Sequence, residues 1–201
     1  MKRPIVVSIT GASGAVYAIR LLEVLLAQRR HVHLIISPAG ATVLNHELGL
    51  EVDPKCFSPE QLRLVLPDSS PELLEFHVHT DYLAAPASGS YLTSGMVVCP
   101  CSGGTLSAIA QGTSRNLIQR AADVHLKERR KLILVPRETP LSLVYIENMH
   151  RACAAGAVIL PAMPGWYHGV RSVDDLVDFV VARILDQLAV EHELSRRWGA
   201  E

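Results

Sequence analysis

Glycines and hydroxyl-bearing side chains follow two apolar segments, each time where a helical pattern begins. Residues 5–10 run into Gly11-Ala12-Ser13-Gly14, and residues 96–101 run into Ser102-Gly103-Gly104-Thr105. The N–H groups at the start of a helix favour an anion such as a phosphate, and glycine lets a ligand approach the backbone closely. A plain strand-to-helix turn, or a helix capped by its own serine, has the same sequence pattern. A phosphate site and simple capping therefore both stay open.

Charged side chains further along the chain could bind an anion or transfer protons. Arg120, Asp123 and Lys127 share one face of a predicted helix, so the two cations can converge on one anion. A solvated helix face with an Asp123–Lys127 ion pair is the alternative. Arg137 and Glu138 directly follow another apolar segment, where loop residues are candidates for ligand binding and proton transfer.

A second anion site is suggested near the end of the chain. Arg183 lies on the same side of a predicted helix as Leu176 and Phe179. Such a position is costly for an arginine unless it is paired, or faces a ligand or a neighbouring subunit. Tyr167 precedes this helix and could share an anion with Arg183.

The cysteines point to neither a metal nor a disulfide framework. Cys56, Cys99, Cys101 and Cys153 have no zinc-knuckle spacing, so reduced thiols in a cytosol are the expectation. Cys99 and Cys101 lie in an apolar segment, where a thiol is more often inert packing than reactive.

The chain shows no secretory signal pattern and no apolar run of about 18 residues. We therefore expect a cytoplasmic protein.

The composition indicates one globular domain. The 201 residues are 49% hydrophobic, with 20 acidic and 19 basic side chains and a net charge of −1. A chain of this length buries enough surface to fold without disulfides or a structural metal. The near-neutral charge argues against nucleic acid as a partner, because such proteins carry a strongly basic surface.

Apolar segments alternate with helical patterns, as in α/β proteins whose parallel sheet is covered by helices on both faces. The expected strands span 5–10, 31–37, 76–79, 96–101, 131–135 and 157–160. The expected helices span 15–28, 41–48, 105–111, 117–130, 141–155 and 173–189. The proline-containing residues 51–71 read as a surface excursion rather than a domain boundary. We predict a single Rossmann-like, doubly wound domain over residues 1–201, with ligands at the carboxyl ends of the strands.

The end of the second expected strand indicates which kind of nucleotide the protein would bind. It ends in Ser37-Pro38, without the acidic residue that binds the ribose in NAD sites. A mononucleotide therefore fits better than NAD, and an NAD-dependent oxidoreductase is disfavoured.

Six motifs together carry a resemblance to a known family. They are GASGA at 11–15, PASGS at 86–90, CPCSGGTLS at 99–107, RAADVHLKERR at 120–130, VPRETP at 135–140 and GAVILPAMPGWYH at 156–168. In this order they look like the UbiX family of flavin prenyltransferases, and the match runs from about residue 5 to residue 198. Each motif alone is unspecific, whereas the ordered set is specific.

The resemblance implies a metal-independent enzyme. It would transfer a dimethylallyl group from dimethylallyl phosphate to N5 and C6 of reduced FMN. The prenylated FMN would serve a UbiD-type decarboxylase, in ubiquinone biosynthesis or aromatic acid decarboxylation. Family members form large homo-oligomers, so the resemblance implies a dodecamer in which residues 190–201 form a tail packing on a neighbouring subunit.

The resemblance also assigns site residues. Those implied for FMN are Gly11, Ala12, Ser13, Ser37, Ser102, Gly103, Gly104, Thr105 and Arg137, with Ser88 and Gly89 lining the isoalloxazine and prenyl pocket. Those implied for the isoprenyl phosphate are Arg120, Lys127, Tyr167 and Arg183, whose fixed charges would meet the departing phosphate. Those implied for catalysis are Ser13, Glu47, Lys127 and Glu138, with the two glutamates as proton carriers. Tyr82 and Trp198 would stabilise an allylic cation by cation–π attraction.

Two departures and two alternatives accompany this interpretation. Many family members have Trp at the position of Tyr82 and a basic residue at that of Pro38. A related FMN-dependent cysteine decarboxylase would share the fold, but we would expect its catalytic histidine between residues 11 and 30, where this chain has none. A non-catalytic flavin-binding subunit would have little use for the charged residues at one sheet edge.

Overall fold

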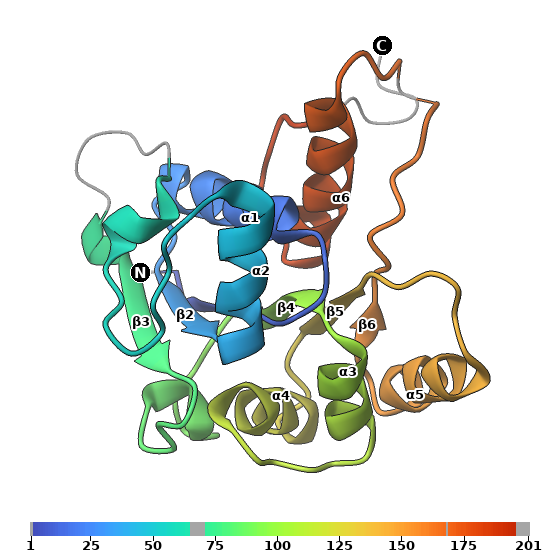
Figure 1. Cartoon of the computed structure of the whole chain (residues 1–201). Helices are drawn as coiled ribbons and strands as arrows, with labels where there is room; N and C mark the ends of the chain where they lie inside the picture. The colour runs from blue at the N-terminus through green and yellow to red at the C-terminus, as the bar shows by residue number, and fades with distance from the viewer. Residues whose placement is uncertain (1, 65–70, 168, 196–201) are drawn as a thin grey trace.

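Six parallel strands form one sheet in the order β3-β2-β1-β4-β5-β6 (Figure 1). This computed structural model describes residues 2–64, 71–167 and 169–195. The strands are β1 (Ile5–Ile9), β2 (Val32–Ile36), β3 (Leu74–Val78), β4 (Gly95–Cys101), β5 (Leu132–Pro136) and β6 (Val158–Ile159). Every expected strand is confirmed, with ends displaced by one or two residues. The strand order reverses between β1 and β4, as in doubly wound Rossmann-like sheets.

The described residues form six α-helices, five of them between strands and α6 after β6. They are α1 (Ala15–Ala27), α2 (Pro38–Leu48), α3 (Gly103–Ala110), α4 (Leu117–Lys127), α5 (Leu143–Ala154) and α6 (Val173–Gln187). Helix α2 begins three residues earlier than the sequence predicted, because Ser37 caps it and Pro38 takes its first position. In the part of the chain described, no helix is long and apolar enough to cross a membrane.

The helices cover the two faces of the sheet in separate layers (Figure 1). Val7 and Val97 pack into one core with residues of α1, α2 and α6. Val6 and Val98 pack into a second core with residues of α3, α4 and α5. Successive residues of a strand point to opposite faces, so an apolar run without alternation predicts this arrangement. The expectation of one doubly wound α/β domain is confirmed.

The edge strand β3 departs from the pattern of the inner strands. Glu75 and Val78 are exposed, and among the described residues β3 pairs only with β2. The expected surface excursion follows α2 and contains the short 3-10 helix Pro59–Leu62. Val52 and Leu62 are nevertheless buried, so this segment packs onto the domain rather than leading to a second one.

Candidate active site

The loops after β1 and β4 meet at the position where the strand order reverses, and Thr10 joins them. Its hydroxyl donates to the carbonyl oxygen of Pro100 at 2.7 Å and accepts from the N–H of Ser102 at 2.8 Å. Thr10 is almost fully buried, with 1% of its surface exposed. Since ligands of doubly wound sheets bind where these loops part, Thr10 sets the relative position of two candidate ligand loops. The sequence analysis did not identify it.

A carboxylate caps the helix that follows the first loop. The N–H groups of Gly14 and Ala15 donate to Glu47 Oε2 at 3.0 and 2.9 Å. Gly14 has a φ of 110°, which glycine adopts without strain, and it provides no side-chain cap of its own. Glu47 therefore supplies the N-terminal cap of α1 from the neighbouring helix α2. Its carboxylate takes up two of the N–H groups that the sequence offered to a phosphate.

Ser13, Glu47 and Arg137 form one polar group at the start of α1. Arg137 Nε donates to the carbonyl oxygen of Ser13 at 3.4 Å, which ties the loop after β5 to the loop after β1. Partial burial raises the pKa of Glu47, but hydrogen bonds from Ser13, Ala15 and Gly14 and the charge of Arg137 outweigh it. The pKa of Glu47 is therefore held below its usual value, and this side chain is an ionised hydrogen-bond acceptor at neutral pH.

Replacing Glu47 by alanine is expected to destabilise the protein by about 1 kcal/mol near neutral pH, because α1 loses its cap. The native pKa lies below the unfolded value of 4.5, so this contribution is complete above that value. It disappears as the pH falls through the native pKa. Urea unfolding near neutral pH and at progressively lower pH measures the difference. The control is Glu51→Ala, which removes an exposed glutamate just after α2. Equal stability of Glu47→Ala and Glu51→Ala near neutral pH would contradict this role.

Two serine hydroxyls that the resemblance assigns to the FMN site act as helix caps in the structure. Ser37 Oγ accepts from the N–H of Gly40 at 3.0 Å at the start of α2. Ser102 Oγ accepts from the N–H of Thr105 at 3.4 Å and donates to Thr105 Oγ1 at 3.0 Å at the start of α3. The N–H groups of a first helical turn have no partner within the helix and remain suited to an anion. Capping and phosphate binding are therefore compatible here.

The glycines at the start of α3 have different surroundings. A Cβ added to Gly103 would lie 2.9 Å from Cε2 of Tyr145, so only glycine allows this close packing. A Cβ added to Gly104 would meet no atom within 4 Å. The backbone of Gly104 therefore faces open space, as a ligand-binding helix start requires.

A cavity of about 590 Å³ lies beside Ser37, at the carboxyl ends of β2 and β3. Pro38, Asn45 and His79 are among the residues that line it. His79 Nδ1 is buried without a hydrogen-bond partner among the described residues, and it remains available to a ligand. The volume lies in the range of small-molecule sites. The sequence analysis missed His79, because one histidine after an edge strand gives no signal.

The loop with Ser88 and Gly89 packs on α4. Arg120 Nε donates to the carbonyl oxygen of Ala87 at 3.1 Å, and Arg120 also pairs with Asp123 at 2.8 Å. A Cβ added to Gly89 would lie 2.8 Å from Lys127 Nζ, so this loop runs directly beside the lysine. The predicted pocket residues and the cations of α4 are thus neighbours. The alternative Asp123–Lys127 pair is not formed, because Asp123 pairs with Arg120 instead.

Arg130 also holds this loop and was missed by the sequence analysis. It donates to the carbonyl oxygens of Gly89 and Tyr91, the latter at 2.7 Å. Lys127 pairs with the adjacent Glu128. The sequence placed Arg130 at the end of the helix, and only the fold reveals that its guanidinium reaches the loop.

Tyr167 and Arg183 both belong to the region of α6. The ring of Tyr167 contacts Phe179 edge-on, with 5.8 Å between ring centroids. Arg183 lies one turn further along the helix and pairs with Asp186 at 2.7 Å. Its side chain is 53% exposed. Arg183 is thus paired, one of the conditions that the sequence analysis set for an arginine beside Leu176 and Phe179.

The cations predicted to hold one phosphate form two groups within a single chain. Arg120 and Lys127 belong to the layer of α4, whereas Tyr167 and Arg183 belong to the layer of α6 on the other face of the sheet. Figure 1 shows these helices on opposite sides of the strands. One chain alone therefore does not bring the four residues to one anion.

The remaining predicted residues have different surroundings. Glu138 is exposed, and its Oε1 accepts from the N–H of Thr139 at 3.1 Å. Tyr82 is 47% exposed, and its hydroxyl donates to the carbonyl oxygen of Ser114 at 3.4 Å. Gly11 lies against Ala39, since an added Cβ would be 2.5 Å from the Cβ of that residue, and Ala12 beside it is buried. Trp198 lies outside the described residues.

The two central cysteines take no part in this site. Cys99 and Cys101 are fully buried in β4. Burial raises the pKa of Cys99 far above its usual value and that of Cys101 to about 12. Both thiols therefore stay protonated, which agrees with inert packing rather than nucleophilic chemistry.

Comparisons with known proteins give the same class as the fold. Residues 1–185 match the family model described as Flavoprotein. The fold and this match together define a flavoprotein with a Rossmann-like domain.

Relatives with high sequence identity narrow the class. A flavin prenyltransferase UbiX of Halalkalibacterium halodurans is 50% identical over 195 residues, which cover 97% of this chain and 93% of the relative. The crystal structure of AnUbiX in complex with FMN and dimethylallyl pyrophosphate is 38% identical, with a TM-score of 0.86 and full coverage of both chains. A dodecameric FMN-dependent UbiX-like decarboxylase from Escherichia coli O157:H7 is 40% identical, with a TM-score of 0.84 and full coverage of both chains. This chain belongs to the UbiX flavin prenyltransferase family and is an enzyme of the prenyltransferase class.

Proposed function

We propose that this protein transfers a dimethylallyl group from dimethylallyl phosphate to N5 and C6 of reduced FMN, without a metal ion. The observation that carries the proposal is the convergence of three loops, after β1, β4 and β5, through Thr10 and Arg137. A 38% identical structure of the same fold is a complex with FMN and dimethylallyl pyrophosphate, which supports this choice of ligands.

The residues at the strand ends fit FMN. The open space at Gly104 and the first-turn N–H groups of α3 leave room and donors for a phosphate. Those that would hold FMN are Gly11, Ala12, Ser13, Ser37, Ser88, Gly89, Ser102, Gly103, Gly104, Thr105 and Arg137. When bound, reduced FMN supplies the two nucleophilic positions, N5 and C6, that receive the dimethylallyl group.

The cationic side chains would bind the phosphate of the prenyl donor. Arg120, Lys127 and Arg183 carry fixed charge that stabilises a phosphate as the allylic C–O bond breaks, and Tyr167 adds a hydroxyl. Charges of this kind can replace a metal ion in neutralising the leaving group. Tyr82, and Trp198 outside the described residues, would face the allylic cation.

Two carboxylates and a hydroxyl would handle positioning and proton transfer. Glu138 is exposed at the carboxyl end of β5, where a bound donor can reach it. Glu47 is ionised and so can accept a proton, while Ser13 hydrogen-bonds Glu47 and can orient the flavin or the phosphate.

The separation of the two cationic groups supports an assembly in which neighbouring chains complete each site. Four large apolar side chains are exposed by 66–73%. They are Leu143 and Val144 on α5, Trp166 before α6, and Val173 at the start of α6. Apolar surface of this extent favours subunit contacts. We propose a homo-oligomer, a dodecamer like the E. coli UbiX-like structure, with residues 190–201 packing on a neighbouring subunit.

The product and the compartment complete the proposal. Prenylated FMN would pass to a UbiD-type decarboxylase, either in ubiquinone biosynthesis or in aromatic acid decarboxylation. A cytoplasmic location is supported by the four cysteines, which are all free thiols.

The decisive test is an anaerobic reaction of the purified protein with reduced FMN and dimethylallyl phosphate, without added metal. We expect mass spectrometry of the extracted flavin to show the addition of one five-carbon unit. A parallel reaction with dimethylallyl diphosphate identifies the preferred donor, and a reaction without donor is the control. Unmodified flavin with both donors, despite tight FMN binding, would overturn the proposal. It would favour an FMN-dependent cysteine decarboxylase or a non-catalytic flavin-binding subunit.

A further inference from the structure

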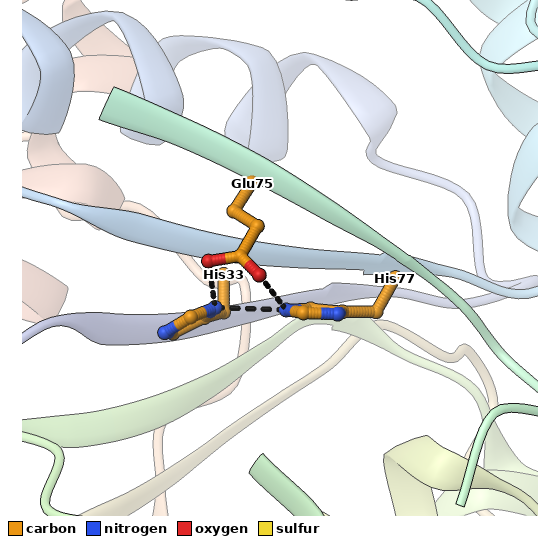
Figure 2. Close-up of side chains that lie close together, drawn as sticks. All are labelled: His33, Glu75 and His77. Carbon is orange, nitrogen blue, oxygen red and sulfur yellow. Dashed lines mark hydrogen bonds and ion pairs between the residues drawn. The ribbon is translucent and has the colours of Figure 1, made fainter. Parts of the chain in front are cut away.

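Two histidines and a glutamate converge at the edge of the sheet, between β2 and β3. His33 lies near the start of β2, directly opposite Glu75 of β3, and His77 follows two residues later on the same face. Figure 2 shows the two imidazoles edge to edge with the carboxylate above them. Neither the sequence motifs nor the proposed prenyl transfer uses these three residues.

The facing nitrogen and oxygen atoms of the three residues lie close to the separations of metal ligands. His33 Nδ1 lies 2.8 Å from His77 Nε2 and 3.3 Å from Glu75 Oε2, and His77 Nε2 lies 3.6 Å from Glu75 Oε1. Ligands about 2.0–2.1 Å from a tetrahedral zinc ion are about 3.3–3.4 Å apart. The two histidine nitrogens would need to separate by about half an ångström, and the carboxylate would turn one oxygen toward the ion.

The protonation of the cluster also favours a cation. In their neutral forms the two facing nitrogens can share only one proton, and the carboxylate has none. Displacing that one proton would leave lone pairs from all three residues facing one small volume.

We propose that His33, Glu75 and His77 form a binding site for a zinc-type divalent transition-metal ion, separate from the prenyl-transfer site. Imidazole and carboxylate ligands suit zinc and its neighbours, whereas magnesium and calcium prefer sites built from oxygen atoms alone. Glu75 is 61% exposed at its side chain, which gives the ion a path from solvent. With three protein ligands, a water molecule would complete a tetrahedral site.

The surroundings of His33 assign a structural role to this ion. His33 Nε2 hydrogen-bonds the hydroxyl of Tyr91 at 2.8 Å, the kind of second contact that orients a metal-binding imidazole. Tyr91 closes the loop that carries Ser88 and Gly89. The ion would therefore join the edge strand β3 to β2 and, through Tyr91, restrain the loop beside α4.

The test is equilibrium binding of Zn²⁺ to metal-free, untagged protein, by competition with a chromophoric chelator and by elemental analysis. We expect one ion per chain and a melting temperature that rises with zinc concentration. Co²⁺ in place of Zn²⁺ should give the visible absorption of a tetrahedral site. Glu75→Gln keeps an exposed side chain of similar size, so it should fold normally, and it should bind Zn²⁺ at least tenfold more weakly.

A matched control and a second variant make the result decisive. His150→Gln removes an exposed histidine of α5, distant from the cluster, and should bind Zn²⁺ like the unaltered protein. His77→Gln should lose the Co²⁺ absorption. No stoichiometric binding, or binding unaffected by both Glu75→Gln and His77→Gln, would overturn the proposal. None of these measurements depends on prenyl transfer, so the metal site and the proposed function can fail separately.

Discussion

Arg183→Ala is expected to slow dimethylallyl transfer about 10²–10³-fold while FMN affinity is unchanged. The guanidinium would stabilise the negative charge that grows on the phosphate as the allylic bond breaks, and removing one such fixed group typically costs this factor. Arg183 is half-exposed and its pairing with Asp186 is a surface contact, so the truncation should leave the fold intact. Single-turnover formation of prenylated flavin, with FMN binding measured in parallel, checks the prediction.

Arg151→Ala is the matched control for this experiment. Arg151 is also an exposed helical arginine with a hydrogen bond to a single side chain, Gln111, at 3.2 Å, and no role in anion binding is assigned to it. It should transfer the prenyl group at the unaltered rate. If Arg183→Ala does the same at saturating donor, Arg183 plays no part in stabilising the leaving phosphate. If only the donor concentration needed for half-maximal rate rises, Arg183 stabilises the bound donor and the transition state equally.

The strands and the location of the ligand loops could be predicted from the sequence because both depend on local pattern. An unbroken apolar strand such as residues 132–136 must be covered on both faces, which requires helices on both sides of a parallel sheet. Glycine and serine directly after β1 and β4 then fall at the carboxyl edge by topology alone. The start of α2 was misplaced, because the pattern of apolar residues does not register a capping serine followed by proline.

The contacts that organise the site could not be predicted, because they join residues distant in sequence. Gly14 offers no cap, and nothing near it indicates that Glu47, 33 residues away, provides one. Leu176 and Phe179 share the side of the helix on which Arg183 lies, yet those two are only partly buried and Arg183 is exposed. Spacing along a helix gives a face, but the neighbouring elements decide which part of that face is covered.

Thr10→Val is expected to destabilise the protein by about 2 kcal/mol and to weaken FMN binding. Valine keeps the shape of threonine but lacks the hydroxyl, so the buried N–H of Ser102 loses its acceptor at 2.8 Å. The carbonyl oxygen of Pro100 keeps only the longer bond from the N–H of Thr10, at 3.3 Å. The Thr10 hydroxyl bonds both Pro100 and Ser102. Without it, the start of α3 would shift relative to β1. Urea unfolding and a flavin fluorescence titration measure the two effects.

Two further variants separate the hydroxyl from the shape of the residue. Thr10→Ser keeps the hydroxyl and should retain most of the FMN affinity. Thr113→Val removes an exposed hydroxyl after α3 that hydrogen-bonds the carbonyl oxygen of Ala108 at 3.2 Å, and should change neither quantity appreciably. Equal stability and FMN affinity for Thr10→Val and Thr113→Val would mean that the loops hold their position without Thr10. If Thr10→Val loses stability and FMN affinity and Thr10→Ser recovers them, the buried Thr10 hydroxyl sets the geometry of the FMN site.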